Sequence, residues 1–288
     1  MEIIRKLQDM QSRAVDMHQQ GKTIAFVPTM GFLHKGHLSL MREGRKRGDI
    51  LVVSIFVNPA QFGPNEDFDK YPKSFEQDAD AAKKEGVDIL FNPCKEELYP
   101  ERYQTYVNVE KLQNYLCGVS RPLHFRGVAT VVTKLFNIVK ADAAIFGEKD
   151  YQQLVVIRQM ALDLNLDIEI KGCPIVREPD GVAMSSRNSY LSEKDRKSAV
   201  CLYQALNEAK KLVKEGVKKS SEIIMTASAL IRSYPGTEID YISIFDPETL
   251  EEIESVEELS RMAMAVRLGE TRLIDNILID PRKKGSRA

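Results

Sequence analysis

Two histidines with a lysine and a glycine between them, His34 and His37, lie between a β-type run and the start of a predicted helix. Imidazoles can donate hydrogen bonds to phosphate oxygens, and Gly36 lets a phosphate approach the backbone closely. A helix amino terminus adds unpaired N–H groups and a partial positive charge. The pattern therefore indicates phosphate binding, with stabilisation of the negative charge that develops during a reaction.

Other interpretations of this segment compete with phosphate binding. Gly31 and Gly36 have the spacing of a P-loop, but His37 follows where that motif requires a lysine, so a P-loop is not supported. His37 alone is typical of a residue that caps a helix, and two histidines could also bind a metal ion. The pair together with its glycines favours phosphate chemistry.

Three further polar segments could contribute to such a site. Asn58 and Gln61 in NPAQFG carry amides that donate and accept, which suits hydroxyl and carboxylate groups. The segment 146–153 (FGEKDYQQ) offers Lys149 as a mobile positive charge, and the segment 184–188 (MSSRN) sets two hydroxyls beside a guanidinium that can bind two phosphate oxygens. Taken singly, each is also compatible with a turn or a solvated helix start.

Alternating strands and helices must position these segments. Strands are predicted at 23–27, 50–57, 87–91, 143–146 and 167–173, and helices at 3–20, 37–47, 74–86, 128–139 and 151–164. The helix at 74–86 begins with a capping-box spacing, Ser74 to Gln77. The alternation predicts an α/β fold with a Rossmann-like parallel sheet and helices on both faces. Ligands of such sheets bind beyond the carboxyl ends of the strands, where the first three polar segments are expected.

The pattern changes after about residue 176. Helices are predicted from Ser192 and over 220–233, followed by strands at 239–245, 262–267 and 272–279. We expect two domains, residues 1–176 and a smaller α+β C-terminal lid domain over residues 177–288. The basic carboxyl end, residues 281–288, is expected to fray.

Composition narrows the class of protein. The chain has 288 residues, 41 of them basic and 42 acidic, with a net charge of −1, and 43% of its residues are hydrophobic. A sizeable core is therefore available, and the balanced charge argues against a nucleic-acid binder. No apolar run approaches the ~20 residues that span a bilayer, no signal-peptide core is present, and the four cysteines form no C-x-x-C pair. We expect a reduced, cytoplasmic protein without nucleic-acid or membrane partners.

Together, the motifs PTMGxLHxGH, NPxQF, RPxHFxG, FGEKDxQQ and MSSRN resemble those of the pantoate–β-alanine ligase family, the pantothenate synthetases, within the nucleotidylyl-transferase superfamily. The blocks stand in the family's order and cover nearly all of the first 190 residues. The resemblance implies a homodimeric ligase of pantothenate biosynthesis. Pantoate would attack the α-phosphorus of ATP to give pantoyl adenylate and pyrophosphate, and β-alanine would then displace AMP to give pantothenate.

The resemblance also implies roles for individual residues. His37 would be the proton donor, with His34 and Lys149 as the other catalytic groups. Gln61 and Gln153 would bind pantoate, and Gln61 would also contact β-alanine. The ATP site would comprise Met30, Gly31, Phe32, Leu33, His34, Lys35, Gly36, His37, Gly147, Glu148, Lys149, Asp150, Val176, Met184, Ser185, Ser186 and Arg187.

By the same resemblance, residues 1–176 would bind ATP and pantoate, and residues 177–288 would close as a lid that keeps water from the adenylate. Mg²⁺ should accompany ATP, mostly through its phosphates and water. Some family members have two adjacent acidic ligands and a glutamine for this ion. The matching positions here read Gln77, Asp78 and Ala81, so the protein ligands of magnesium stay unassigned.

Three other functions fit the sequence less well. Gln61 and Gln153 suit an unphosphorylated polyol acid, which argues against a transferase that stops after nucleotide transfer. The near-zero net charge and the short chain argue against a fragment of a class I aminoacyl-tRNA synthetase. A non-catalytic nucleotide sensor would not need His34, His37 and Lys149 together, because backbone amides suffice for binding.

Overall fold

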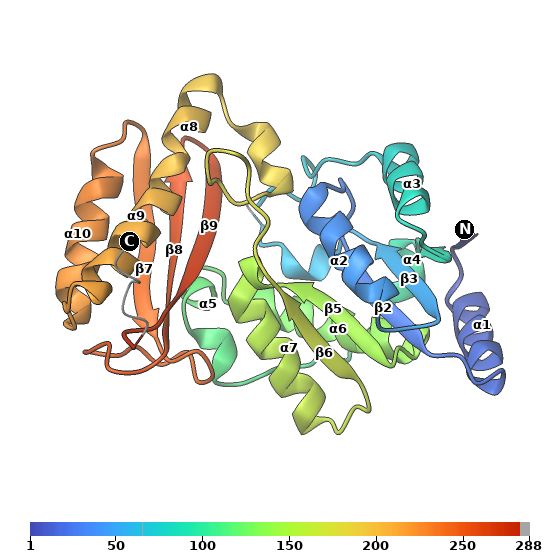
Figure 1. Ribbon diagram of the computed structural model, residues 1–288. Helices are drawn as coiled ribbons and strands as arrows, with labels where there is room; N and C mark the ends of the chain where they lie inside the picture. Colours follow the sequence, from blue (N-terminus) through green and yellow to red (C-terminus); the bar gives the residue numbers. More distant parts are fainter. Residues whose placement is uncertain (65, 283–288) are drawn as a thin grey trace. The chain divides into compact units, whose positions relative to one another are not determined.

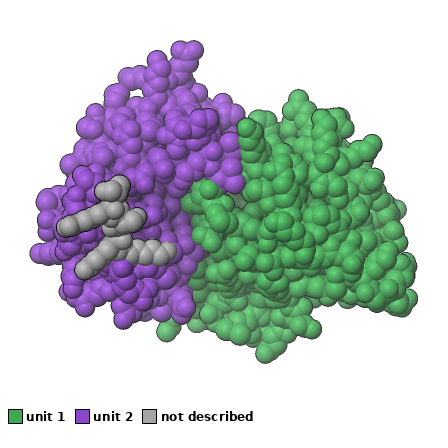
Figure 2. Space-filling view, in the orientation of Figure 1, with its two compact units in different colours: residues 1–114, 118–148, 152–175 green, residues 115–117, 149–151, 176–288 purple. Residues whose placement is uncertain are grey.

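The computed structural model describes residues 1–64 and 66–282, so most of the basic end, residues 283–288, lies outside the described part. The chain forms two compact units (Figure 2). The main segment of the second unit begins at Val176. This unit also includes the short segments 115–117 and 149–151, whereas the remaining residues before Val176 belong to the first unit.

A six-stranded parallel sheet forms the centre of the first unit (Figure 1). Its strands, in spatial order, are β1 (Glu2–Ile4), β4 (Ile89–Phe91), β3 (Ile50–Ile55), β2 (Ile24–Thr29), β5 (Ala143–Gly147) and β6 (Glu169–Cys173). After β2 the chain adds β3 and β4 on one side, and it then returns to place β5 and β6 on the other side of β2. The position between β2 and β5 is the switch point at which sheets of this kind bind their ligands. The predicted Rossmann-like parallel sheet is confirmed.

Helices cover both faces of this sheet because successive strand side chains point to opposite sides. Ala25 and Val27 of β2 pack with α2 and α3, whereas the ring of Phe26 meets that of Phe136 in α6 with centroids 6.5 Å apart. Helix α1 packs on α6, and α7 contacts α6 through Thr133. These helices are α1 (Leu7–Gln19), α2 (Lys35–Arg45), α3 (Phe75–Lys84), α6 (His124–Val139) and α7 (Tyr151–Asp163).

The sequence prediction was wrong at two helix starts. Ile3 and Ile4 belong to the edge strand β1, which pairs with β4, and the helix begins only at Leu7. A few apolar residues fit either period, so a neighbouring strand decides between them. Ser74 does precede α3, but its side chain makes no cap and instead donates to Asp78 Oδ1 at 3.4 Å, so no capping box forms.

The second unit has its own sheet and core. Antiparallel strands β7 (Thr237–Phe245), β8 (Ser260–Leu268) and β9 (Thr271–Ile279) pack with helices α9 (Val200–Lys214) and α10 (Ser220–Arg232), and α8 (Glu193–Ser198) packs with α9. Buried Leu206 of α9, Ile223 of α10 and Met264 of β8 belong to one apolar cluster, which joins the helices to the sheet. The predicted α+β character of this part is confirmed.

Short helices complete the described chain: α4 (Lys95–Leu98), α5 (Cys117–Ser120), η1 (Pro59–Gln61), η2 (Leu112–Asn114), η3 (Glu148–Asp150) and η4 (Ser186–Tyr190). Three of them, η1, η3 and η4, coincide with the polar segments singled out from the sequence. Within the described residues, none of the helices has the length and apolar character needed to cross a membrane.

Candidate active site

The side chains of the two histidines after β2 both accept backbone N–H groups at the start of helix α2. His34 is the N-cap residue, and its Nδ1 accepts a hydrogen bond from the Gly36 backbone N–H at 3.1 Å. The Nδ1 of His37 accepts from the His34 backbone N–H at 3.3 Å, and the two ring centroids are 4.1 Å apart. This is the reciprocal arrangement of a capping box, built here from two imidazoles.

The mutual cap determines which nitrogen of each ring is a donor. Because Nδ1 of His34 and Nδ1 of His37 both accept backbone hydrogen bonds, the proton of each neutral ring lies on Nε2. Capping and phosphate binding are therefore compatible uses of the same side chains. The capping interpretation is confirmed, and phosphate binding stays a prediction.

A buried carboxylate on α3 holds the loop that carries these histidines. Asp78 is 3% exposed; its Oδ2 accepts from the Phe32 N–H at 2.8 Å and its Oδ1 from the Leu33 N–H at 2.7 Å. Gly31 has a φ of +84°, and a Cβ there would stand 3.0 Å from Asp78 Oδ2. The loop thus depends on glycine and aspartate together.

The sequence pattern does not single out Asp78 as a loop anchor. An acidic residue in the first turn of a helix is commonly explained by the helix dipole alone. The available signal was its place on the buried face: Asp78 and Ala82, four residues apart, are the buried residues of α3. A carboxylate on such a face requires hydrogen-bonding partners.

The NPAQF segment interlocks with the histidine loop. Asn58 Nδ2 donates to Gln61 Oε1 at 3.0 Å and to the Gly127 carbonyl oxygen at 3.1 Å, while Asn58 Oδ1 accepts from the Tyr99 hydroxyl at 2.8 Å. Gln61 Nε2 lies 3.1 Å from the sulfur of Met30. The structure therefore brings Gln61 and the loop after β2 together, and it gives Asn58 a supporting role.

The RPxHFxG motif supports Gln61 from the start of α6. Arg121 Nη2 and His124 Nδ1 lie 3.2 and 2.9 Å from the Gln61 carbonyl oxygen. Gly127 permits close packing, since a Cβ there would stand 2.1 Å from the carbonyl oxygen of Ala60. From the sequence this motif contributed only to the family resemblance; the structure shows it as the support of the Gln61 loop.

The two glutamines at the start of α7 differ in their surroundings. Gln152 is buried and donates to the Leu112 carbonyl oxygen at 2.9 Å. Gln153 is half-buried, and its amide makes no hydrogen bond to any of the described residues. Of the two, Gln153 has the amide that remains available to a ligand, in keeping with the predicted assignment.

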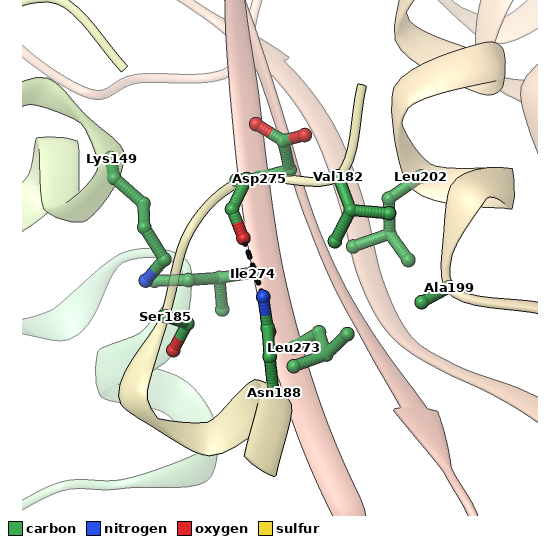
Figure 3. Close-up of a pocket in the computed structure, with 10 residues that line it drawn as sticks. Lys149, Val182, Ser185, Asn188, Ala199, Leu202, Leu273, Ile274 and Asp275 are labelled. Atoms are coloured by element: carbon green, nitrogen blue, oxygen red, sulfur yellow. Dashed lines mark hydrogen bonds between the residues drawn. The ribbon is translucent and has the colours of Figure 1, made fainter. Parts of the chain in front are cut away.

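Two of the remaining predicted residues, Lys149 and Ser185, line a small pocket in the second unit (Figure 3). The pocket is small and partly open, since its roughly 260 Å³ of space between atoms includes open solvent, and Lys149, Ser185, Asn188 and Asp275 are among the residues that line it. Figure 3 shows the Lys149 amine and the Ser185 hydroxyl on the same side of it. Ser185 also caps η4, because its Oγ accepts from the Arg187 N–H at 3.3 Å.

Asp275 faces this pocket with its charge already balanced. Arg177 donates from Nη1 to Asp275 Oδ2 at 2.6 Å and from Nη2 to Oδ1 at 3.0 Å. Burial raises the pKa of Asp275 above its usual value, and the Arg177 guanidinium acts against that shift. Lys149 Nζ lies 3.6 Å from Oδ1 of half-buried Asp150, and its positive charge, like that of Arg177, lowers the pKa of Asp275.

The predicted site residues thus fall into two sets. The first unit carries Met30–His37, Gln61, Gly147, Glu148 and Gln153, and the second carries Lys149, Asp150, Val176 and Met184–Arg187. Within the second set, the Met184 N–H donates to the Val176 carbonyl oxygen at 3.0 Å. Neither Arg177 nor Asp275 belongs to a motif recognisable in the sequence.

Known proteins resemble this chain over nearly its full length. The family model for pantoate-beta-alanine ligase matches residues 2–278. The pantothenate synthetase of Desulfatibacillum aliphaticivorans is 57% identical over 281 residues, which is 98% of this chain and 100% of that protein. The crystal structure of pantothenate synthetase from Thermus thermophilus matches with a TM-score of 0.91 at 42% identity, covering 96% of this chain and 99% of that one. The pantoate-beta-alanine ligase of Francisella tularensis, complexed with beta-gamma ATP and beta-alanine, has a TM-score of 0.80 at 34% identity, covering 96% of this chain and 97% of that one.

We expect Asp78→Asn to destabilise the protein. An amide has one acceptor oxygen, so one of the two backbone N–H groups of the loop would face an NH₂ group and stay unsatisfied, at a cost of about 1–3 kcal/mol. Urea denaturation followed by circular dichroism should show this loss in the free energy of unfolding. Asp80→Asn, exposed on the same helix, is the matched control and should change it by less than about 0.5 kcal/mol. Equal midpoints for the two variants would show that the loop does not need Asp78.

The ion pair between Glu66 and Arg121 predicts a pH dependence of stability. Burial raises the pKa of Glu66, but the hydrogen bonds and charge of Arg121 outweigh it, and the pKa lies below its usual 4.5. A lowered pKa in the folded state means that Glu66 stabilises the fold above pH 4.5 and loses this effect as the pH falls through the folded-state pKa. We expect the melting temperature of Glu66→Gln to lie below that of the wild type at pH 7. The difference between the two melting temperatures should narrow as the pH falls through the folded-state pKa of Glu66. A constant difference would contradict this role of the carboxylate.

Proposed function

The chain belongs to the pantoate-beta-alanine ligase family, and from that premise we propose that it condenses (R)-pantoate with β-alanine through an enzyme-bound pantoyl adenylate made from ATP. Membership makes the protein a ligase and supports pantothenate as its product. The observation that carries the ATP-dependent route is the mutual histidine cap at the switch point of the sheet, beside the Gln61 loop.

In the proposed first step, a carboxylate oxygen of pantoate attacks the α-phosphorus of ATP, and the bond to the β-phosphate oxygen breaks to release pyrophosphate. In-line transfer of this kind needs positioning and charge neutralisation more than covalent help. His34 and His37 would donate from Nε2 to phosphate oxygens at the amino terminus of α2. Lys149, Ser185 and the Ser186–Arg187 pair would bind the phosphates from the second unit.

In the proposed second step, the β-alanine amine attacks the acyl carbon, an amide bond forms, and AMP leaves with the carboxylate oxygen on its phosphate. Gln61 and Gln153 would hold pantoate, and Gln61 would also contact β-alanine. The relative from Francisella tularensis was solved with beta-gamma ATP and beta-alanine, which supports the use of both substrates here. The second unit as a lid and a homodimeric assembly are further parts of the proposal.

Magnesium is proposed to enter with ATP, bound mostly through the phosphates and water. Among residues 1–64 and 66–282, no three His, Cys, Asp or Glu side chains are grouped so that they could hold an ion. Both carboxylate oxygens of Asp78 already accept backbone N–H groups. The ion is therefore assigned to the phosphates of ATP and to water, as Mg²⁺ prefers, and no step depends on a protein ligand.

Product analysis tests the proposal directly. Incubation with ATP, Mg²⁺, pantoate and β-alanine should form pantothenate, AMP and pyrophosphate in equal amounts, and omission of any one substrate should stop pantothenate formation. Release of ADP and phosphate instead of AMP and pyrophosphate would contradict the adenylate and favour an acyl phosphate.

We expect substitutions of His37 and Gln153 to affect different steps. His37→Ala should lower turnover about 10²–10³-fold, as expected for the loss of one transition-state donor. His37→Gln keeps a side chain that can complete a capping box, so it should retain thermal stability but not turnover. Gln153→Ala should raise the KM for pantoate and leave ATP binding, measured calorimetrically, nearly unchanged. Full turnover in His37→Gln would show that the ring serves only as a cap.

A further inference from the structure

The backbone of Lys149 is held by the three-stranded sheet of the second unit. Asn276 on β9 donates from Nδ2 to the Lys149 carbonyl oxygen at 3.0 Å. Its Oδ1 accepts a hydrogen bond from the guanidinium of Arg261 on β8. That guanidinium lies over the ring of Tyr151, with its central carbon 3.7 Å from the ring centroid. Asn276 and Arg261, which are bonded to each other, therefore contact the backbone of Lys149 and the ring of Tyr151.

These contacts are better suited to fixing geometry than to adding stability. Asn276 is 3% exposed and Arg261 is 5% exposed, so both polar groups have been taken out of water. Burial of polar and charged groups costs free energy that their hydrogen bonds only offset, and well-packed apolar residues often serve stability equally well. Directional contacts between buried groups do, however, hold one conformation of the segment that they bind.

The segment held in this way places Lys149 in the pocket of Figure 3. A lysine side chain has a flexible four-carbon stem. The position of its amine therefore depends on how firmly the backbone of the same residue is held. Asp275, the residue before Asn276, pairs with Arg177 in the segment that leads to Ser185. Two consecutive residues of β9 thus hold the two segments whose side chains line the pocket.

We propose that Asn276 is a positioning residue for Lys149, whose carbonyl it binds so that the ammonium group meets the phosphates of ATP in the pocket. The inference rests on the proposed ATP-dependent function. It assigns a role to β9, a part of the chain in which no motif was recognised. Asn276 does not touch the substrate itself, and its effect on the reaction should therefore disappear when the Lys149 side chain is absent.

Asn276→Asp separates the two contacts of this side chain. A carboxylate keeps the shape and the acceptor for Arg261, but it cannot donate to the Lys149 carbonyl oxygen. We expect kcat/KM for ATP to fall about 10-fold, within the range known for small misplacements of a catalytic group, and the KM for pantoate to stay within about twofold. Asn207→Asp is the matched control, because Asn207 donates in the same way to the Tyr203 carbonyl oxygen at 2.9 Å on the exposed side of α9.

A double-variant cycle distinguishes positioning from a general loss of structure. In a Lys149→Ala background, Asn276→Asp should lower kcat/KM for ATP by less than about twofold, because residues that act through one another are not additive. If the aspartate variant does not fold, Asn276→Ser, whose hydroxyl is too short to reach Lys149, should reproduce the same ATP-specific loss. Full additivity, or wild-type kinetics in the folded variant, would overturn the inference.

Failure of the proposed function would look different. It would show as a wild-type protein that forms no pantothenate, or as a Lys149→Ala variant that uses ATP as well as the wild type does. An ATP defect in Lys149→Ala together with unchanged kinetics in Asn276→Asp and Asn276→Ser would overturn the role of Asn276 alone.

Discussion

The candidate active site depends on two capping hydrogen bonds, from the Gly36 N–H to the His34 ring and from the His34 N–H to the His37 ring. They satisfy backbone N–H groups at the start of α2, and by accepting at Nδ1 they direct the donor of each ring to Nε2. Capping of the helix start and the proposed phosphate binding would therefore use the same two side chains. Asp78 and Gly31 serve this arrangement, because the preceding loop can present the histidines only while its own N–H groups are bonded.

The two units contribute different chemistry. In the first unit, neutral donors and amides gather around the loops after β2 and β3, which suits orientation of a small polar acid. In the second unit, the buried carboxylate of Asp275 pairs with Arg177, and the cation of Lys149 lies in the same pocket, 3.6 Å from Asp150 Oδ1. Both kinds of group are required by the proposed transfer, since the acid must be aligned and the leaving pyrophosphate must be neutralised.

Most of the fold could be predicted from the sequence because each strand or helix depends mainly on residues close together in the chain. Apolar runs bounded by glycine predict most strands and helices, and the position of His37 at a predicted helix start indicates a cap, which the structure shows. The residues that support the site act across the chain and have no local signature. Asp78 lies 46 residues from Phe32, Asp275 lies 98 residues from Arg177, and Asn276 lies 127 residues from Lys149. Pairing also overrides local pattern at Ile3 and Ile4, which form a strand only because β4 lies beside them.

Isotope exchange between labelled pyrophosphate and ATP would reveal an adenylate that forms before β-alanine reacts. The exchange is measured with pantoate present and β-alanine omitted. We expect label to enter ATP at a rate that depends on pantoate, and AMP and pantothenate to be released once β-alanine is added. If the protein binds ATP and pantoate and forms pantothenate but shows no exchange, an adenylate that forms before β-alanine reacts would be contradicted.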